Sequence, residues 1–243
     1  DRISALTQAE VGVPPTVLVL GETGTGKDVV ARLLHSKSSL KEKPFVHVDC
    51  ASLPKDLIES ELFGHEKGAF TNANNARAGL IEAAEDGVLF LDEVAEIPID
   101  LQSKLLGVLE RRSLRRIGST KERPIAAWII AATNRNIESL VKNGEFRSDL
   151  YYRLNVMAIT IPALRERDND VVMLGNYYAE ATSKRYGLSF DGFSKGALRQ
   201  IKEYSWYGNV RELKHLIERA VLLSGGGLLD ENMLGIDKNV GNN

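Results

Sequence analysis

The segment from Gly21 to Asp28, GETGTGKD, has the residue types and spacing that point most directly to chemistry. It has the form G-x-x-x-x-G-K, in which glycines let backbone N–H groups converge on phosphate oxygens and the lysine adds a positive charge. The preceding run, Thr16 to Leu20, is apolar and β-branched and predicts a buried strand. The following residues, Val29 to His35, have helical apolar spacing, so the loop would lie at a helix N-terminus. This context predicts a site for nucleotide phosphates.

The residues that we expect to contact the phosphates run through the loop into the next helix: Gly21, Glu22, Thr23, Gly24, Thr25, Gly26, Lys27, Asp28 and Val29. Lys27 would reach the β and γ phosphates as a point charge. Asp28 stands where many such loops carry Ser or Thr as a Mg²⁺ ligand, and we expect it in the metal shell. The alternative, a glycine-rich turn before an ordinary helix, is disfavoured by the strand and helix patterns on either side.

A second apolar run, Val88 to Leu91, ends in the adjacent carboxylates Asp92 and Glu93. A buried parallel strand would deliver this pair to the carboxyl edge of the sheet, where ligands of open α/β sheets bind. Asp92 would then hold Mg²⁺ directly or through water, and Glu93 would polarise the attacking water as a general base. The alternative is that Asp92 and Glu93 form a solvated acidic pair at a strand end. The glycine loop upstream disfavours this alternative.

Strands and helices alternate through the first two thirds of the chain, which predicts a parallel sheet sandwiched by helices. Further strands are expected at 44–50, 125–132 and 156–161, and helices at 52–62, 79–84 and from 99 onward, with Ser52 as an N-cap. The strand at 125–132 ends in Thr133 and Asn134, a polar pair that can orient a water or a γ-phosphate. From Asp168 the pattern changes to helices, at 168–186, 194–204 and 209–223. We therefore expect two domains, 1–167 and 168–243.

Two loops and several arginines leave their roles open. Phe70 lies in a Gly- and Asn-rich stretch, where it could fold back onto the core or be presented with Thr71 to a partner. The run Arg111 to Arg116 could be a solvated turn, an inter-subunit contact or a lining for a polyanion. Arg211 lies just inside a predicted helix N-terminus, where the helix dipole disfavours a cation unless an anion such as a nucleotide phosphate is near.

The composition excludes several classes of protein. A net charge of −2 argues against a constitutively basic nucleic-acid surface, and a single cysteine excludes an internal disulfide and fits a reducing cytosol. No apolar run approaches a membrane span and the N-terminus lacks a signal-peptide pattern, so we expect a cytoplasmic protein without a membrane partner. The chain opens with Asp1 in place of an initiator Met, and we expect it to be part of a longer protein.

Several segments occur together in an order that resembles one family, the central AAA+ domain of sigma-54-dependent transcription activators, the NtrC-like bacterial enhancer-binding proteins. The segments are Gly21 to Asp28, Gly68 to Ala73, Leu89 to Glu93, Ala132 to Asn134, Phe146 to Arg153 and Trp206 to Leu213. A generic AAA+ ATPase would share the glycine loop and the Asp-Glu strand, but not the approach ELFGHE to the GAFT motif. The resemblance implies an AAA+ P-loop NTPase fold with a small C-terminal helical lid.

Carried over residue by residue, the resemblance implies specific roles. The glycine loop with Lys27 and Asp28 corresponds to Walker A, Asp92 with Glu93 to Walker B, and Asn134 to the first sensor. Arg211 corresponds to the second sensor in the lid. Arg147 and Arg153 correspond to arginine fingers that reach the γ-phosphate of a neighbouring subunit, so hydrolysis would require a homo-oligomer, a hexameric or heptameric ring.

The resemblance also implies the partners. The cofactors would be ATP and Mg²⁺, and the work would be remodelling of the complex between RNA polymerase and sigma-54. The residues that grip the sigma factor would be Gly68, Ala69, Phe70, Thr71, Asn72 and Ala73, and the stretch around Arg115, Arg116 and Ile117 would be the second pore loop. DNA contact would come from a helix-turn-helix domain that these 243 residues do not contain.

Three residues depart from the family pattern. Asn72 replaces a glycine of the contact motif, and because asparagine tolerates positive φ we expect the sigma-factor contact to be weakened or retuned. Asp49 replaces the asparagine that pairs with the Walker B glutamate. Carboxylate repulsion at Asp49 would make the ATPase activity unusually pH-sensitive, and we count Asp49 among the catalytic residues. Asp28 is shorter than the usual glutamate.

Two other functions remain compatible with these residues. The chain could be a regulatory switch that binds nucleotide and oligomerises without activating transcription, an alternative that Asn72 makes possible. It could also be a ring ATPase acting directly on nucleic acid through the Arg111 to Arg116 run. The mildly acidic net charge and the lack of stacking aromatics near those arginines weigh against the second alternative.

Overall fold

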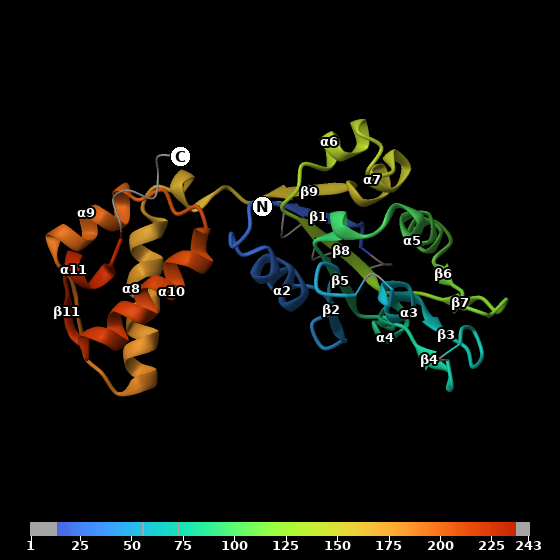
Figure 1. Ribbon diagram of the computed structural model, residues 1–243, viewed down its shortest axis with the longest axis horizontal. Coiled ribbons are helices and arrows are strands. Elements are labelled where there is room, and N and C mark those ends of the chain that lie inside the picture. Colours follow the sequence, from blue (N-terminus) through green and yellow to red (C-terminus); the bar gives the residue numbers. More distant parts are fainter. Residues whose placement is uncertain (1–13, 55, 72, 237–243) are drawn as a thin grey trace. The chain divides into compact units, whose positions relative to one another are not determined.

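A computed structural model describes residues 14–54, 56–71 and 73–236 of the chain (Figure 1). The chain divides into two compact units: the first contains the residues up to Leu20 and Lys27–Thr160, and the second contains Gly21–Gly26 and the residues from Ile161 onward. We expected a boundary between residues 167 and 168. The observed division differs because the glycine loop is hydrogen-bonded to the C-terminal region, with Val210 N donating to Gly24 O at 3.0 Å.

The first unit is built on a five-stranded parallel sheet with the order β2-β5-β8-β1-β9. Its strands are β1 (Val17–Leu20), β2 (Phe45–Asp49), β5 (Val88–Asp92), β8 (Trp128–Thr133) and β9 (Met157–Thr160). Each coincides, within a few residues, with a strand predicted from the sequence. The parallel α/β fold is therefore confirmed.

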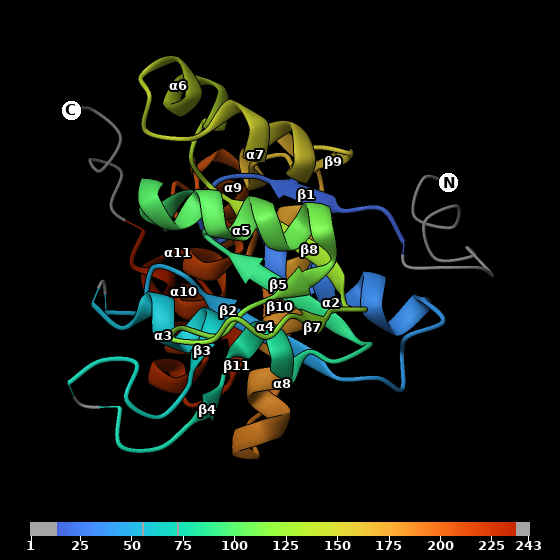
Figure 2. The ribbon, with the colours of Figure 1, turned by 90° about the vertical axis from the view of Figure 1, so that its right-hand side faces the viewer.

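Helices cover both faces of this sheet. The helices are α2 (Lys27–Lys37), α3 (Ile58–Phe63), α4 (Leu80–Ala83), α5 (Ile99–Arg111), α6 (Ile137–Lys142) and α7 (Ser148–Leu154). Leu18 and Leu89 belong to one core cluster with Leu105 of α5. Side chains alternate along a strand, so Val19 and Phe90, which follow Leu18 and Leu89, face the opposite side of the sheet and are also buried. Helix α2 covers that side, where it contacts β1 and β5. Figure 2 shows α5 beside α7, with which it is in contact.

Two short antiparallel hairpins extend from the first unit. One pairs β3 (Gly64–His65) with β4 (Arg77–Ala78), and the other pairs β6 (Ser113–Leu114) with β7 (Arg123–Pro124). A 3₁₀ turn, η1 (Val94–Glu96), follows β5. The loops that the family resemblance assigns to partner contact lie within these two hairpins.

The predicted helix at 52–62 is wrong over its first half. Ser52 does not cap it: the Ser52 Oγ donates to Asp49 O at 2.9 Å and closes a turn after β2. The helix α3 begins at Ile58, because Pro54 O accepts hydrogen bonds from Leu57 N and Ile58 N and starts the helical turn there. A serine hydroxyl that bonds locally to the backbone favours a turn over a helix start.

The second unit contains the three predicted helices and, contrary to the expectation of helices alone, a short parallel strand pair. Its elements are η2 (Leu164–Glu166), α8 (Asp170–Tyr186), β10 (Phe190–Phe193), α9 (Lys195–Glu203), α10 (Asn209–Ser224), β11 (Gly227–Leu229) and α11 (Glu231–Leu234). β10 and β11 are four and three residues long and contain glycines, so they lack a strand-length apolar pattern. Trp206, Leu213 and Ile217 lie in a separate hydrophobic core. Of the helices in the described ranges, none combines the length and apolar composition that a membrane crossing requires.

Candidate nucleotide site

The carboxyl ends of the parallel strands place the predicted Walker B residues at one edge of the first unit. β2 ends at Asp49, β5 at Asp92 and β8 at Thr133. The sheet register pairs Asp49 with Asp92 and Leu20 with Thr133, so the strand ends are level. This is the edge of an open α/β sheet at which ligands bind.

Glu93 is held in a strained conformation by several polar contacts. Its backbone lies in the left-handed region, with φ 50° and ψ 49°, which costs a non-glycine residue about 1–3 kcal/mol. Glu93 N donates to Asp92 Oδ1 at 3.0 Å, and Glu93 Oε2 accepts from Asn134 N at 3.0 Å and from Thr133 Oγ1 at 3.4 Å. Such strain persists where surrounding bonds fix the residue, and it is commonest at functional sites.

Lys27 completes this group of side chains. Its side chain is 7% exposed and its Nζ lies 3.4 Å from Glu93 Oε1, so two predicted site residues form an ion pair. A buried ammonium requires such a partner, because an uncompensated charge in the interior is costly. A phosphate that binds Lys27 would therefore compete with Glu93 for the same cation.

Asp92 has the environment expected of a metal-binding carboxylate. Burial raises the pKa of Asp92, the negative charge of Glu93 raises it further, and Lys27 and His47 partly oppose this effect. His47 Nε2 lies 3.5 Å from Asp92 Oδ2. Paired carboxylates that disfavour each other's ionisation suit a divalent cation, so the donor set fits Mg²⁺.

Asp28 and Asp49 lie at the surface. Asp28 is exposed in the first turn of α2, and Asp49 is exposed with its Oδ1 accepting from Ala51 N at 3.1 Å. The described residues contain no cluster of three or more His, Cys, Asp or Glu side chains that could hold a metal. Mg²⁺ with one or two carboxylates would take its other ligands from water and phosphate oxygens, as it usually does.

Cys50, next to this carboxylate edge, is not a reactive thiol. It is buried, and burial, helped by the charges of Asp49, Asp92 and Glu93, raises the pKa of Cys50 to about 12. The thiol therefore stays protonated at neutral pH and acts as a small packing residue.

In the second unit the glycine loop lies directly against the start of α10. Gly24 has φ +80°, and a Cβ there would lie 2.3 Å from Gly208 O, so the position requires glycine. Gly24 O accepts hydrogen bonds from Val210 N at 3.0 Å and from Arg211 N at 3.3 Å. The structure thus brings the loop and the predicted second sensor, Arg211, together.

Asn209 was not singled out from the sequence, yet it organises this contact. It is fully buried with φ 54°; its Oδ1 accepts from Leu164 N at 2.7 Å, and its Nδ2 donates to Thr23 O at 3.0 Å and to Glu22 Oε2 at 3.1 Å. Asparagine is among the residues that best tolerate the left-handed conformation. The Gly208-Asn209 pair at the helix start was the available signal.

Glu22 is the charged member of the loop that this network fixes. The Arg165 guanidinium donates to both of its carboxylate oxygens, at 2.9 and 2.5 Å. These bonds, together with the one from Asn209, lower the pKa of Glu22 to about 2. Glu22 is therefore ionised throughout the physiological range and is a loop-positioning residue in this structure.

A pocket of about 610 Å³ opens beside the loop in the second unit, and it is lined by Thr23, Arg211, Glu212, His215, Arg219 and residues near them. Arg211, His215 and Arg219 are spaced by four residues, so they lie on one face of α10. This face presents basic side chains next to the glycine loop.

The two predicted arginine fingers lie on the side of the first unit formed by α5 and α7. Arg147 immediately precedes α7, is 42% exposed, and donates from Nε and Nη2 to Asp149 at 3.0 and 2.7 Å. Arg153 Nη2 donates to Leu109 O at 2.9 Å. The structure therefore places both arginines with α5 and not with Lys27 and Glu93.

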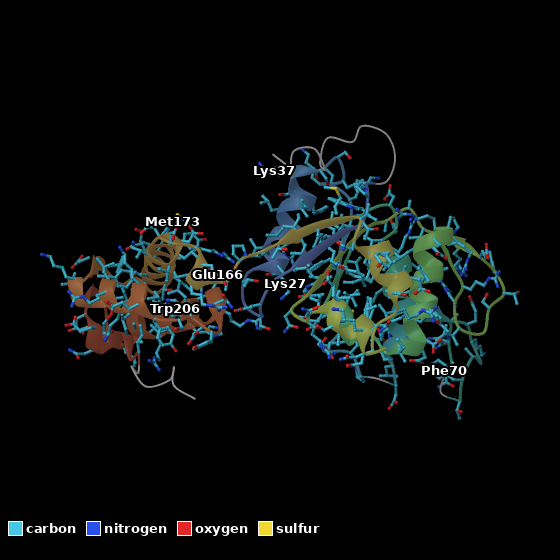
Figure 3. All side chains as sticks on the ribbon, turned by 90° about the horizontal axis from the view of Figure 1, so that it is seen from above. Lys27, Lys37, Phe70, Glu166, Met173 and Trp206 are labelled. Carbon is cyan, nitrogen blue, oxygen red and sulfur yellow. The ribbon has the colours of Figure 1, made fainter. Side chains whose placement is uncertain are left out.

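Phe70 lies in the loop between β3 and β4. Its ring packs edge-on against the ring of His65, with centroids 4.9 Å apart, and remains 40% exposed. Gly68 N donates to Ala73 O at 2.8 Å, which closes the tip of the loop. The Phe70 ring is thus not part of the hydrophobic core, and it is partly covered by the neighbouring His65 side chain. Asn72 lies outside the described residues. In Figure 3 Phe70 and Lys27 lie at different ends of the first unit.

The two hairpin loops are tied together by backbone bonds and by arginines. Ile117 N donates to Gly64 O at 2.9 Å, and Glu66 N donates to Ile117 O at 3.0 Å. Arg116 donates to both oxygens of Glu82 at 2.8 Å and to Glu66 at 3.3 Å, while it is 13% exposed. Arg115 pairs with Glu122 within its own hairpin. Arg116 thus forms an internal ion pair, which is none of the three roles left open by the sequence and which disfavours a polyanion-binding role.

Comparison with known families finds two matches along the chain. Residues 2–160 match the model described as "Sigma-54 interaction domain", and residues 165–238 match the model described as "AAA+ ATPase lid domain". The break between them falls close to the break between the two compact units.

Similar proteins include two transcription regulators and one solved structure. The chain is 47% identical over 215 residues to the DNA-binding transcriptional activator HyfR of Escherichia coli (strain K12), covering 88% of this chain and 32% of that protein. It is 45% identical over 219 residues to the sigma54-dependent transcriptional regulator SfnR of Pseudomonas fluorescens (strain Pf0-1), covering 90% and 60% respectively. NtrX from Brucella abortus in complex with ADP superposes with a TM-score of 0.86 at 31% identity, covering 96% of this chain and 51% of NtrX. The chain therefore spans between about a third and three fifths of these proteins.

Proposed function

Because this chain belongs to the family of sigma-54 interaction domains, we propose that it hydrolyses ATP to drive a sigma-54-dependent transcription activator. In this proposal the domain assembles into a ring, remodels the closed complex of RNA polymerase and sigma-54 in the cytoplasm, and allows open-complex formation. The observation that carries the proposal is the strained Glu93, held between Lys27 and the Thr133–Asn134 strand end.

The glycine loop and Lys27 are proposed to bind the phosphates of ATP. Backbone N–H groups of the loop would donate to phosphate oxygens, and Lys27 would neutralise the β and γ phosphates. Asp92 and Asp28 would hold Mg²⁺, which would supply positive charge against the developing negative charge of the phosphates. A solved complex of NtrX with ATP, similar to this chain with a TM-score of 0.85, supports the choice of nucleotide.

Glu93 is proposed to be the general base. In the structure its carboxylate is paired with Lys27, and a γ-phosphate that takes over this lysine would release it. Glu93 would then accept a proton from a water whose oxygen attacks the γ-phosphorus, while the bond from the γ-phosphorus to the bridging oxygen breaks and ADP leaves. Asn134, whose backbone N–H holds Glu93 in this structure, would help to orient that water.

Arg147 and Arg153 are proposed to complete the site of a neighbouring copy. An arginine supplied in trans stabilises the transferred phosphoryl group and contributes about 10³–10⁵-fold to the rate in well-studied phosphoryl-transfer enzymes. The exposed guanidinium of Arg147 and its place beside α5 support this role. Hydrolysis would consequently require assembly.

Movement of the Phe70 loop is proposed to be the mechanical output. Phe70 and Lys27 lie at different ends of the first unit (Figure 3), so hydrolysis must act on the loop through the intervening structure. The backbone bonds of Ile117 to the first loop, and the ion pairs of Arg116 with Glu66 and Glu82, make the two loops move together. An exposed aromatic side chain on such a coupled loop is suited to grip a protein partner.

The proposal is tested by open-complex formation on a sigma-54 promoter, with purified polymerase, sigma-54 and this chain. With ATP, the native chain should open the promoter, and Glu93→Gln should bind ATP but fail to open it. Glu96→Gln is the matched control, because Glu96 lies three residues away and is 43% exposed. Promoter opening by Glu93→Gln at the native level would contradict the proposal, as would failure of the native chain to open the promoter.

A further inference from the structure

Gln102 is a fully buried polar side chain in the first turns of α5, and every polar atom of its amide is used. Its Nε2 donates to Ile97 O at 2.9 Å and to Glu145 O at 3.3 Å, and its Oε1 accepts from Arg147 N at 2.9 Å. A buried amide left without partners costs about 1–3 kcal/mol, so these bonds fix the side chain in one position. Neither the glycine loop nor the Asp-Glu strand pointed to this residue.

The partners of Gln102 belong to two segments with proposed roles in hydrolysis. Ile97 ends the 3₁₀ turn that follows Glu93, and Ile97 N donates to Val94 O at 3.3 Å. Arg147 is the arginine proposed to act on the ATP of a neighbouring copy. A single buried side chain therefore connects the Walker B segment of one copy to the arginine that the copy presents to its neighbour.

Arg147 is held at its backbone by a buried side chain, whereas its guanidinium is held only by an exposed local ion pair. Arg147 N is bonded to the buried Gln102, and the preceding Phe146 is 2% exposed. The guanidinium is 42% exposed and bonds to Asp149, two residues away. Such an arrangement suits a side chain that must reach into another subunit from a defined starting point, since a fixed base reduces the conformational entropy lost on engagement.

We infer that Gln102 is a positioning residue for Arg147: its buried amide sets the backbone from which the guanidinium is presented to ATP bound by a neighbouring copy. This inference rests on the proposed function, in which Arg147 acts in trans. Gln102 touches neither nucleotide nor reacting atoms. A displacement of about 1 Å at a catalytic group can cost about 10²-fold in rate, so loss of the amide is expected to be felt in turnover.

The first test uses Gln102→Leu, which removes all three bonds, and Gln102→Glu, which retains an acceptor for Arg147 N. We expect kcat for ATP hydrolysis to fall about 10–100-fold in Gln102→Leu and less in Gln102→Glu, with the affinity for a fluorescent ATP analogue unchanged. If Gln102→Leu does not fold, Gln102→Met, which also lacks the amide that accepts from Arg147 N, carries the test. An unchanged kcat in folded Gln102→Leu or Gln102→Met would overturn the inference.

The second test asks on which copy Gln102 acts. Each proposed site combines the ATP-binding residues of one copy with Arg147 of the next, so Gln102→Leu leaves its own ATP-binding residues intact. Lys27→Ala does the reverse, because it disables its own site and keeps Gln102 and Arg147. A mixture of the two variants should therefore hydrolyse ATP well above the mean of the two separate rates.

A control mixture separates failure of this inference from failure of the proposed function. Arg147→Ala mixed with Lys27→Ala should also recover activity if the site is shared between copies. If this control recovers and the Gln102→Leu mixture does not, Gln102 acts within its own copy or is merely structural, and the inference is overturned. If the control itself does not recover, the shared site is wrong, and the inference falls with it.

Discussion

Arg116 and Arg147 belong to the same unit but differ in what their charges do. Arg116 is 13% exposed and binds Glu82 and Glu66, which are 34 and 50 residues away in the chain. Arg147 is 42% exposed, and its guanidinium binds Asp149, two residues away. Ion pairs between distant segments hold a fold together. An exposed ion pair between near neighbours contributes little to stability, and its cation can easily bind another anion instead. Arg116 is thus part of the scaffold, and Arg147 is available to a partner.

The largest expected effect is on turnover. Arg147→Ala should lower kcat for ATP hydrolysis about 10³-fold or more, because the charge proposed to stabilise the transferred phosphoryl group is lost. Its free energy of unfolding should change little, since the lost ion pair is exposed to solvent. Steady-state ATPase assays and urea denaturation of the same preparation measure both quantities. A large loss of stability in Arg147→Ala would show that Arg147, like Arg116, holds the fold together, and would contradict the difference proposed between the two arginines.

Arg116→Ala should show the opposite pattern. Its free energy of unfolding should fall by about 1–3 kcal/mol, because the charge-assisted bonds to Glu82 and Glu66 are lost and Arg123 remains at 3.3–3.4 Å as the weaker partner. Affinity for ATP should be unchanged. Arg115→Ala is the matched control, since Arg115 is 59% exposed and should change stability by less than about 0.5 kcal/mol. Equal stability of the two variants would show that Arg116 is not a scaffold residue.

The contribution of Arg116 should depend on pH in a defined direction. Its hydrogen bonds lower the pKa of Glu82 below the ordinary value of 4.5. A lowered folded-state pKa means that the stabilisation is present above about pH 4.5 and is lost as pH falls through the lowered value. The stability difference between the native chain and Arg116→Ala should therefore shrink on acidification below pH 4.5. A difference that grows under those conditions would contradict the ion pair.

The smallest expected effect concerns Asp92, which can be compared with Glu82. The pKa of Asp92 is raised, whereas that of Glu82 is lowered. Burial and Glu93 raise the pKa of Asp92, so its ionised form disfavours folding, and this cost appears as pH rises through the raised pKa. Asp92→Asn should therefore raise Tm slightly at pH 7 without nucleotide, because it removes a half-buried charge whose ionisation disfavours folding. A lower Tm would show that Asp92 is a stabilising carboxylate like Glu82.

The sequence was sufficient to predict the sheet and most of the helices, because the buried strands are continuous apolar runs and α5 and α10 have helical spacing. It also predicted the Asp92–Glu93 pair at a strand end. Arg211 was expected near a nucleotide phosphate, and its backbone contact with the glycine loop is seen only in the structure. The proposed roles of these residues in hydrolysis remain predictions. Asp49 pairs with Asp92 in the sheet register, as its place at a strand end suggested. Its effect on the pH dependence of ATPase activity stays a prediction.

The remaining features depend on contacts between residues far apart in the chain. Gln102 resembles any polar residue on a helix, and only its bonds to segments near residues 97 and 146 reveal its position. Asn209 and Glu22 meet across more than 180 residues. The late start of α3 depends instead on local hydrogen bonds made by Ser52 and Pro54, whereas the β10–β11 pair joins Phe190 to Gly227. Tertiary contacts of this kind leave little periodicity in the sequence.

The most direct test of the shared site is the specific ATPase rate of the native chain as its concentration is varied at saturating ATP and Mg²⁺, with the oligomeric state measured in the same samples. The rate per chain should be close to zero where the protein is dispersed and should rise steeply as oligomers form, because in the proposed mechanism Arg147 acts on the ATP of another copy. A rate per chain that is constant from dispersed monomers to full assembly would contradict the shared site.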